Sequence, residues 1–329
     1  MPLLEVSNLS VQLQTHRGPA EAVRDVSFSL ERGETLGLIG ESGCGKSITA
    51  LSLLGLLPDN AVISGSIRFD GQQLVGQDDA ALCRIRGNRI GMIFQEPMTA
   101  LNPVHTIGRQ VAEPLRLHRA LSAAAAQKEV TTLLDRVGLV KAARRFDAYP
   151  HQLSGGQRQR VTIAMALACG PDLLIADEPT TALDVTIQQQ ILNLISDLVE
   201  ERGMALMLIS HDLGVIAQNV SRMLVMYGGS VVESGPTDEV FANMSHPYTR
   251  GLFAARPRLG AERGTRLTTI AGTVPELVDL PAGCPFADRC SFTISECRST
   301  RPPTVQISPE HEARCIRLDA VSAAGSIVA

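Results

Sequence analysis

A glycine-rich stretch near the N-terminus constrains the fold of this chain more than any other feature. An apolar, strand-like segment at residues 34–39 leads into it, and residues 47–57 continue as a helix that Pro58 stops. The stretch fits G-x-x-x-x-G-K-[ST] and reads Gly40-Glu41-Ser42-Gly43-Cys44-Gly45-Lys46-Ser47. Glycines let the backbone curl so that its N–H groups converge on a phosphate. We therefore predict a strand–loop–helix phosphate site rather than a chance glycine turn.

Four side chains suit the chemistry of a bound nucleotide. Lys46 is placed to reach the β- and γ-phosphates, and the Ser47 hydroxyl to bind Mg²⁺. Further along, an apolar run at residues 173–176 ends in Asp177 and Glu178. Asp177 would hold Mg²⁺ through its water shell, and Glu178 would polarise a water as general base. Acidic residues at strand ends are common, so this pair alone is weak evidence for a catalytic site. The phosphate loop earlier in the chain makes that interpretation much stronger.

The segments around these carboxylates predict a parallel sheet and hence an α/β fold. Apolar runs at residues 173–176 and 205–209 flank a helical segment that stops at Gly203. The expected apolar stripe of that helix comprises Ile187, Ile191, Leu194 and Leu198. A strand–helix–strand unit of these lengths pairs its strands in parallel.

Alternating polarity predicts antiparallel strands beside this core. Such segments cover residues 3–13, 23–30, 65–74 and 222–235. Asp70-Gly71 and Gly228-Gly229 are the turn signals of the last two. Residues 97–165 have helical periodicity instead, with a helix capped by Ser122 and ended by Gly138. The expected buried face of that helix comprises Val130, Leu133, Leu134 and Val137.

The periodicity fades near residue 250. Residues 251–329 hold seven prolines and four cysteines. An irregular segment of this size needs a crosslink, or packing against a neighbouring part of the protein, to stay ordered. We expect a nucleotide-binding domain at residues 1–250, with a helical subdomain at about 97–165. A small irregular, cysteine-containing domain follows at residues 251–329, and we expect 321–329 to be a frayed tail.

Composition excludes several classes of protein. The net charge is −4, which argues against a nucleic-acid binder that neutralises phosphates, and 44% hydrophobic residues are enough for a core. The longest apolar stretch, residues 48–57, is too short to span a membrane, and the N-terminus lacks the features of a signal peptide. We therefore expect a cytosolic protein, for which any membrane role must come through a partner.

Further motifs give the chain a resemblance to a known family. Leu153-Ser154-Gly155-Gly156-Gln157 resembles the signature sequence of ABC (ATP-binding cassette) ATPases. Gln95 matches the glutamine loop of that family, and His211 matches the switch histidine. The D-loop is matched by Thr181-Ala182-Leu183-Asp184. The resemblance implies a P-loop NTPase core that binds and hydrolyses Mg·ATP.

The resemblance also implies how such a site works. In ABC ATPases two nucleotide domains face each other, and each ATP lies between the phosphate loop of one chain and the signature of the other. Ser154 with the 155–157 backbone would therefore approach the γ-phosphate held by a second subunit, a copy or a paralogue. His211 would contact the γ-phosphate, Gln95 would sense Mg²⁺ and water, and Asp184 would lie at the dimer interface.

One departure from the family concerns adenine. The family usually stacks an aromatic ring on the base, but residues 6–27 contain no Phe, Tyr or Trp. His16, with Arg17 beside it, is the nearest candidate, so stacking is either weaker or made by a cation.

Finer resemblance indicates the branch of importers for dipeptides and oligopeptides. It is carried by Phe94-Gln95-Glu96-Pro97-Met98 and by His246-Pro247-Tyr248-Thr249-Arg250. This implies a peripheral subunit at the cytoplasmic face of the membrane, bound to two permeases that receive peptide from an extracytoplasmic binding protein. The same branch serves nickel, glutathione and some antimicrobial peptides. A soluble ABC ATPase usually has two cassettes or a long coiled coil, neither of which is present, and Glu178 with His211 argues against a non-hydrolysing module.

Four cysteines cluster near the C-terminus, at Cys284, Cys290, Cys297 and Cys315. Their spacing is not that of zinc ribbons, yet four thiolates can bind either Zn²⁺ or an iron–sulfur cluster. The segment at residues 283–290 resembles the C-terminal part of peptide-importer ATPases, some of which hold a 4Fe-4S cluster. We favour that cluster, in a structural role, over zinc and over free thiols.

Overall fold

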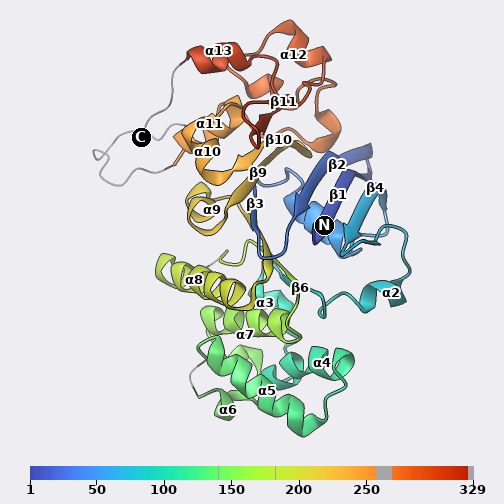
Figure 1. Cartoon of the computed structure of the whole chain (residues 1–329), viewed down its shortest axis with the longest axis vertical. Coiled ribbons are helices and arrows are strands. Elements are labelled where there is room, and N and C mark those ends of the chain that lie inside the picture. Colours follow the sequence, from blue (N-terminus) through green and yellow to red (C-terminus); the bar gives the residue numbers. More distant parts are fainter. Residues whose placement is uncertain (140, 182, 257–268, 325–329) are drawn as a thin grey trace. The chain divides into compact units, whose positions relative to one another are not determined.

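The computed structural model describes residues 1–139, 141–181, 183–256 and 269–324 (Figure 1). Its contacts divide the chain into two compact units. The first comprises Met1–Leu4, Ser29–Thr35 and Arg68–Ile209, and the second comprises Glu5–Phe28, Leu36–Ile67 and Ser210–Ala329. The C-terminal residues thus share a unit with the phosphate loop, while the predicted domain boundary at residue 250 stays a prediction.

The antiparallel strands predicted at residues 3–13, 23–30 and 65–74 form a four-stranded sheet of order β2-β1-β4-β5. Its strands are β1 (Leu4–Thr15), β2 (Gly18–Leu30), β4 (Ala61–Phe69) and β5 (Gln72–Gln73). The Asp70-Gly71 turn is confirmed, since both residues have positive φ, 49° and 78°. Strand β2 begins five residues before the predicted start, because hairpin pairing extends it through a segment without strong strand formers.

In the second unit, strand β3 (Thr35–Ile39) pairs in parallel with β9 (Arg222–Tyr227). A hairpin turned at Gly228-Gly229 connects β9 to β10 (Ser230–Pro236), as predicted. Two short strands, β12 (Glu312–Ala313) and β11 (Val305–Gln306), add antiparallel to β10 in turn. They were not predicted, because two residues are too few for an alternation signal.

The helices of this unit are short. They are α1 (Lys46–Leu53), α9 (Leu213–Asn219), α10 (Thr237–Ala242), α11 (Pro247–Ala254), α12 (Ser295–Ser299) and α13 (Leu318–Ala323), with the 3-10 turns η2 (Leu277–Asp279) and η3 (Ala287–Arg289). Helix α1 ends four residues before the predicted Leu57, because Gly55 turns the chain at φ 60°. The predicted frayed tail was wrong at Val321, which is buried in α13 and accepts a hydrogen bond from Arg250. Residues 325–329 lie outside the described part.

The first unit contains the predicted βαβ arrangement. Strands β6 (Ile90–Ile93), β7 (Leu173–Asp177) and β8 (Ala205–Ser210) pair in parallel, and α8 (Val185–Arg202) connects β7 to β8. Asp184 caps α8 and Gly203 ends it at φ 61°. Of the predicted buried face, Ile191 and Leu198 are confirmed, whereas Ile187 and Leu194 are only partly buried. The buried residues are Ile191, Leu192, Ile195, Leu198 and Val199.

The predicted helical region follows β6 and packs on itself (Figure 1). The short helix α2 (Asp79–Cys83) precedes β6 in the chain. The helical region itself contains α3 (Pro97–Ala100), α4 (Ile107–His118), α5 (Ala123–Arg136), α6 (Ala142–Arg145), η1 (Pro150–Gln152) and α7 (Gly155–Leu167). Helix α5 begins at Ser122, which accepts the Ala125 N–H, and its predicted apolar face is buried. Helix α4 packs against both α5 and α7.

Candidate functional site

The phosphate loop follows β3 and depends on two crowded glycines. Gly40 and Gly45 have φ values of 155° and 104°. A Cβ at Gly45 would lie 2.5 Å from the carbonyl oxygen of Ala22, and one at Gly40 would lie 2.3 Å from that of Met226. Other residues would displace the neighbouring strands, so glycine is required at both positions.

Lys46 is buried at the start of α1, with 5% of its surface exposed. Its ammonium donates to the carbonyl oxygens of Gly40, at 2.7 Å, and Glu41, at 3.1 Å. A positive charge is thus held within the loop beside the N-terminus of α1, where Ser47 lies. This arrangement suits a polyphosphate.

In the first unit, Asp177 and Glu178 lie where β7 ends. Asp177 is 5% exposed and pairs in register with Ile209 of β8. Glu178 has a positive φ of 44°, a conformation that non-glycine residues seldom adopt and that is found at functional sites. Its Oε2 accepts the Thr181 hydroxyl at 3.0 Å, a contact whose only sequence signal was the spacing of three residues.

Gln95 lies beside this carboxylate because β6 and β7 are parallel neighbours. Its amide Nε2 donates to Oε2 of Glu178 at 3.0 Å. The structure therefore brings together the predicted glutamine and the predicted general base, which are 83 positions apart in the chain.

The signature residues form the N-terminus of α7. The Ser154 hydroxyl accepts the Gln157 N–H at 3.4 Å, and the Gln157 side chain accepts the Ser154 N–H at 3.2 Å. This capping box leaves Gly155 and Gly156 in the first turn of a 13-residue helix. A Cβ at Gly156 would lie 2.9 Å from Ile187, so a small residue is needed there.

The remaining predicted residues lie at turns. Asp184 caps α8 by accepting the Ile187 N–H at 3.0 Å, while Ala182 of the D-loop lies outside the described residues. His211 is exposed directly after β8. At the β1–β2 turn His16 is exposed, whereas Arg17 binds the carboxylates of Asp279 and Glu276. Arg17 therefore contacts the C-terminal segment, which leaves His16 as the stacking candidate.

Comparisons with known proteins agree with this geometry. The family described as ABC transporter matches residues 23–181, and the one described as oligopeptide/dipeptide transporter, C-terminal region, matches residues 232–297. A Brucella ovis protein named as a peptide import ATP-binding protein is 51% identical over 334 residues, which cover 98% of this chain and 99% of the relative. The chain belongs to the ABC transporter ATP-binding family.

Other relatives place this ABC ATPase in the same fold. The oligopeptide transport ATP-binding protein OppD of Mycobacterium tuberculosis is 47% identical across 98% of this chain and 53% of its own length. The solved structure of the cassette MJ0796, a dimer in a post-hydrolysis state bound to ADP and Pi, is 30% identical with a TM-score of 0.64, covering 71% of this chain and 98% of that one. CbiO1 from Clostridium perfringens is 28% identical with a TM-score of 0.61, covering 74% and 92%.

The four C-terminal cysteines of this ABC ATPase interact electrostatically. Burial, together with a smaller contribution from the other three cysteines, raises the pKa of Cys284 to about 12. Three cysteines accept a backbone N–H from two residues further along the chain: Cys284 from Phe286, Cys290 from Phe292, and Cys315 from Arg317. Such bonds favour the thiolate, the form that binds metals. Within the described residues, no three His, Cys, Asp or Glu side chains are grouped closely enough to hold a metal ion.

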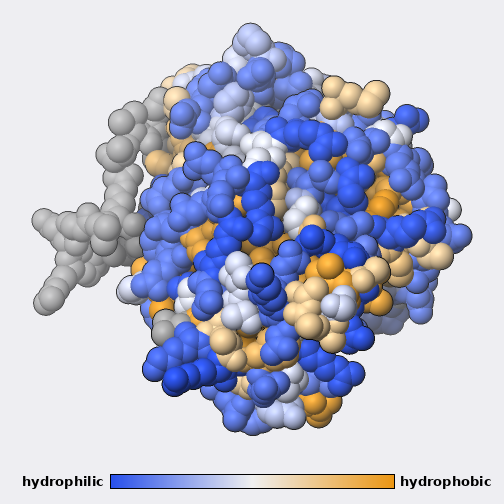
Figure 2. Space-filling view, turned by 60° about the horizontal axis from the view of Figure 1, so that its bottom comes forward, coloured by the Kyte–Doolittle hydropathy of each residue, from blue (hydrophilic) through white to orange (hydrophobic). Residues whose placement is uncertain are grey.

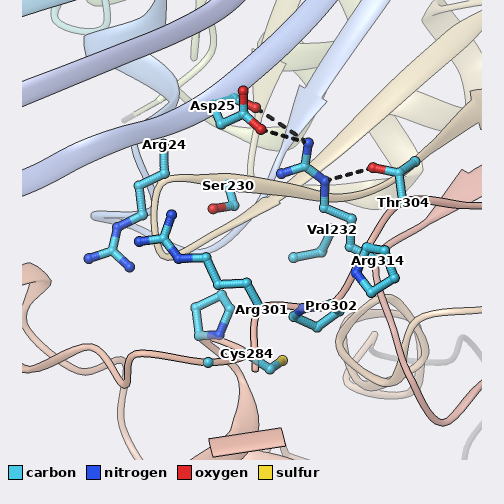
Figure 3. Close-up of a pocket in the computed structure, with 12 residues that line it drawn as sticks. Arg24, Asp25, Ser230, Val232, Cys284, Arg301, Pro302, Thr304 and Arg314 are labelled. Atoms are coloured by element: carbon cyan, nitrogen blue, oxygen red, sulfur yellow. Dashed lines mark hydrogen bonds and ion pairs between the residues drawn. The ribbon is translucent and has the colours of Figure 1, made fainter. Parts of the chain in front are cut away.

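A pocket of about 190 Å³ lies where the cysteine-rich segment meets β2 and β10 (Figure 3). Cys284 is on its wall, and Arg314 reaches across it to Asp25 and Thr304. Arg24 and Arg301 extend toward each other, and burial together with the charge of Arg301 lowers the pKa of Arg24. The segment that carries the cysteines thus packs against two strands of its own unit.

Proposed function

We propose that this ABC ATPase powers the uptake of dipeptides or oligopeptides through an importer in the cytoplasmic membrane. One observation carries the proposal: a complete set of ATPase motifs shares a chain with a C-terminal region of the oligopeptide/dipeptide transporter type. Two of the relatives above are named for peptide import and oligopeptide transport.

In the proposed reaction, the phosphate loop binds ATP and Glu178 activates water. The Lys46 ammonium and the N–H groups of residues 40–47 receive the β- and γ-phosphates. Ser47 and Asp177 supply oxygen ligands of the kind that suit Mg²⁺, which would neutralise phosphate charge. Gln95 and Thr181 orient the Glu178 carboxylate through Oε2, and His211 contacts the γ-phosphate.

A second ATPase subunit, identical or paralogous, would complete each site. Ser154 and the N–H groups of residues 155–157 form a helix N-terminus, which binds anions well. We propose that this terminus contacts the γ-phosphate held by the other subunit, with Asp184 at the interface. ATP then favours the closed pair, and this preference drives the motion of the permeases.

The segment around Gln95 is the proposed contact for a permease. Phe94, Met98 and Val104 are exposed by 44%, 59% and 73%, which is unusual for large apolar side chains lying so near each other in sequence. Figure 2 shows one mainly hydrophilic face of the molecule that is interrupted by apolar patches. No helix in the described part of the chain is long and apolar enough to cross a membrane. We propose a peripheral subunit at the cytoplasmic face, docked on two permeases. An extracytoplasmic binding protein would deliver peptide to these permeases.

We further propose that the four C-terminal thiols hold a 4Fe-4S cluster with a structural role. Four cysteines with three N–H···S hydrogen bonds form a suitable donor set once the side chains converge. Protein prepared without oxygen should be brown and carry about four irons per chain, the content of one such cluster. A colourless protein with one zinc would contradict the cluster and keep the metal site.

The functional test is ATPase activity of the chain assembled with its permeases in lipid, with and without peptide-loaded binding protein. Peptide import predicts strong stimulation by the loaded binding protein. Stimulation by nickel chelates or glutathione instead would keep the ATPase mechanism and change the substrate. Failure to recover any permease would contradict the transport role and favour a soluble ABC ATPase.

A further inference from the structure

The phosphate loop is bound directly by the cysteine-rich segment. The carboxylate of Glu41, the second residue of the loop, forms a forked ion pair with the guanidinium of Arg289. Nη1 lies 2.6 Å from Oε2, and Nη2 lies 3.1 Å from Oε1. The Arg289 side chain is 5% exposed and the Glu41 side chain 28%, so water screens this pair less than a fully exposed ion pair.

Arg289 is itself held by several groups of the second unit. Its Nε donates to the carbonyl oxygen of Ala271 at 3.0 Å, and Nη1 donates to the Tyr227 hydroxyl at 3.3 Å. The guanidinium lies 5.7 Å from the ring centre of Tyr227 and 5.9 Å from that of Phe286. The side chain therefore has one preferred position, which points its fork at the loop.

The backbone of Glu41 is fixed by the same surroundings. Its N–H donates to the Tyr248 hydroxyl at 2.8 Å. The Tyr248 ring packs 4.7 Å from Tyr227 and 5.3 Å from Phe286, centre to centre. Since Phe286 lies between Cys284 and Cys290, the 284–290 loop forms part of this support.

A second contact joins the same segment to the middle of the phosphate loop. A Cβ at Gly228 would lie 2.8 Å from Cβ of Pro285, so Pro285 is in close contact with the β9–β10 turn. The next residue of that turn, Gly229, donates its N–H to the carbonyl oxygen of Cys44 at 3.1 Å. A shift of residues 284–290 would therefore reach the phosphate loop by two routes.

The charge of Glu41 makes this contact important for nucleotide binding. A carboxylate inside a loop that receives a polyphosphate repels its ligand. The Arg289 guanidinium neutralises that charge and keeps the Glu41 side chain from rotating into the loop. Arg289 is adjacent to Cys290, so its position depends on how residues 284–290 are folded.

We propose that Arg289 is a positioning residue for ATP binding, which neutralises and holds Glu41 and so makes nucleotide affinity depend on the fold of the 284–290 loop. The proposal rests on the ATP site described above, and it holds for any transported substrate. It gives the cysteine-rich segment a role in the ATPase itself.

The first test compares Arg289→Ala with the matched control Arg298→Ala. Arg298 also neighbours a cysteine, Cys297, but its ion pair with Asp288 is exposed. In the full chain, a fluorescent ATP analogue should bind Arg289→Ala about tenfold more weakly, on the scale of a forked, partly buried charged pair, and Arg298→Ala, whose ion pair is exposed, within about twofold of the wild type. In the assembled transporter, KM should rise with little change in kcat. Wild-type affinity in Arg289→Ala would overturn the proposal.

A rescue experiment separates this role from general support of the fold. Glu41→Gln removes the carboxylate charge, so adding it to Arg289→Ala should restore much of the lost affinity. Arg289→Lys, which keeps the charge without the fork, should fall between wild type and Arg289→Ala. If Glu41→Gln gives no recovery while circular dichroism shows folded protein, the ion pair is not the cause and the proposal is wrong.

A separate experiment tests whether nucleotide affinity depends on the fold of residues 284–290. Cys290→Ser should weaken nucleotide binding and speed amide hydrogen exchange at residues 40–47, whereas the exposed Cys83→Ser should do neither. In the Arg289→Ala background, Cys290→Ser should add little. If amide exchange at residues 40–47 and nucleotide affinity were both unchanged in Cys290→Ser, the proposed dependence of ATP binding on the 284–290 loop would be wrong. A wild-type chain that bound no ATP would instead contradict the ATPase assignment.

Discussion

Glu178 has a left-handed backbone conformation at the end of a buried strand, and two side chains orient its carboxylate. Residues held in such conformations store strain that the surrounding structure must stabilise, and they gather at functional sites. The backbone N–H of Glu178 donates to the Ile209 carbonyl oxygen at 3.0 Å, which helps to hold this conformation. The carboxylate is therefore presented by the fold, consistent with its proposed role as the base.

Replacing this base should separate binding from turnover. Glu178→Gln keeps the shape and loses the proton acceptor, so we expect ATP affinity near that of the wild type and turnover lower by about 10²–10⁴-fold. Glu200→Gln, on the exposed face of α8, is the control. ATP turnover at the wild-type rate in Glu178→Gln would refute the assignment.

His246 makes stability depend on pH. It is 1% exposed, and its Nδ1 accepts the Tyr248 N–H at 3.1 Å. Burial lowers its pKa to about 4. The unfolded chain therefore binds the proton more tightly, and stability is lost as pH falls from about 6.5 towards 4.

The size of this loss can be measured by urea unfolding at pH 8 and pH 5. The contribution of His246 should make the wild type about 2 kcal/mol less stable at pH 5. His246→Asn keeps a capping oxygen and should lose most of this pH dependence, while His151→Asn, at an exposed position, should keep it. Equal pH dependence in wild type and His246→Asn would show that burial of this imidazole is not the cause.

Among the elements, α7 links helix capping to the proposed trans contact. Its N-terminus is capped by Ser154 and Gln157, and at the N-terminus of α5 the Ser122 hydroxyl likewise accepts a backbone N–H. The two caps allow stability and activity to be separated, because only one of them lies in the signature sequence.

Removing either cap should cost similar stability but affect activity differently. Ser154→Ala and Ser122→Ala should each lower the free energy of unfolding by about 1 kcal/mol. Only Ser154→Ala should also reduce the ATPase rate of the assembled transporter, since its hydroxyl is proposed to approach phosphate. Equal ATPase rates in the two variants would remove Ser154 from the site.

Across the whole molecule, one buried carboxylate joins distant parts of the second unit. Glu233 of β10 accepts the N–H groups of Ser245 and His246 at 2.6 and 3.0 Å, and it lies 2.9 Å from Nε2 of His311. This carboxylate thus connects the hairpin, the start of α11 and the strands added by the C-terminal segment.

Glu233→Ala should therefore destabilise the chain strongly, by about 3 kcal/mol, because it leaves buried donors without their acceptor. Glu239→Ala is the control, since the side chain of this exposed residue accepts the Ser308 hydroxyl at the surface; its effect should stay within about 0.5 kcal/mol. Denaturant midpoints of the two variants provide the measurement. A small effect at Glu233 would mean that the C-terminal strands are held by other contacts.

The sequence by itself determined the local chemistry of this protein. Strong local patterns predicted the phosphate loop, the carboxylate pair, the signature helix and the βαβ unit, because each depends on residues close together in the chain. It also predicted the hairpin turns, which need residues that tolerate positive φ. Its errors were shifts in α1, α8 and the start of β2, the short strands β11 and β12 that it missed, and the frayed tail expected at Val321. All of these features are fixed by contacts with neighbouring elements.

Only the tertiary structure decided which distant residues meet. The Gln95–Glu178 contact follows from the pairing of β6 with β7. The ion pair of Arg17 with Asp279 could not be predicted from the sequence of the turn that contains Arg17. The Arg289–Glu41 pair joins residues 248 positions apart. No local pattern encodes such a pair, because its energy arises from burial and charge at a position that exists only after the chain has folded.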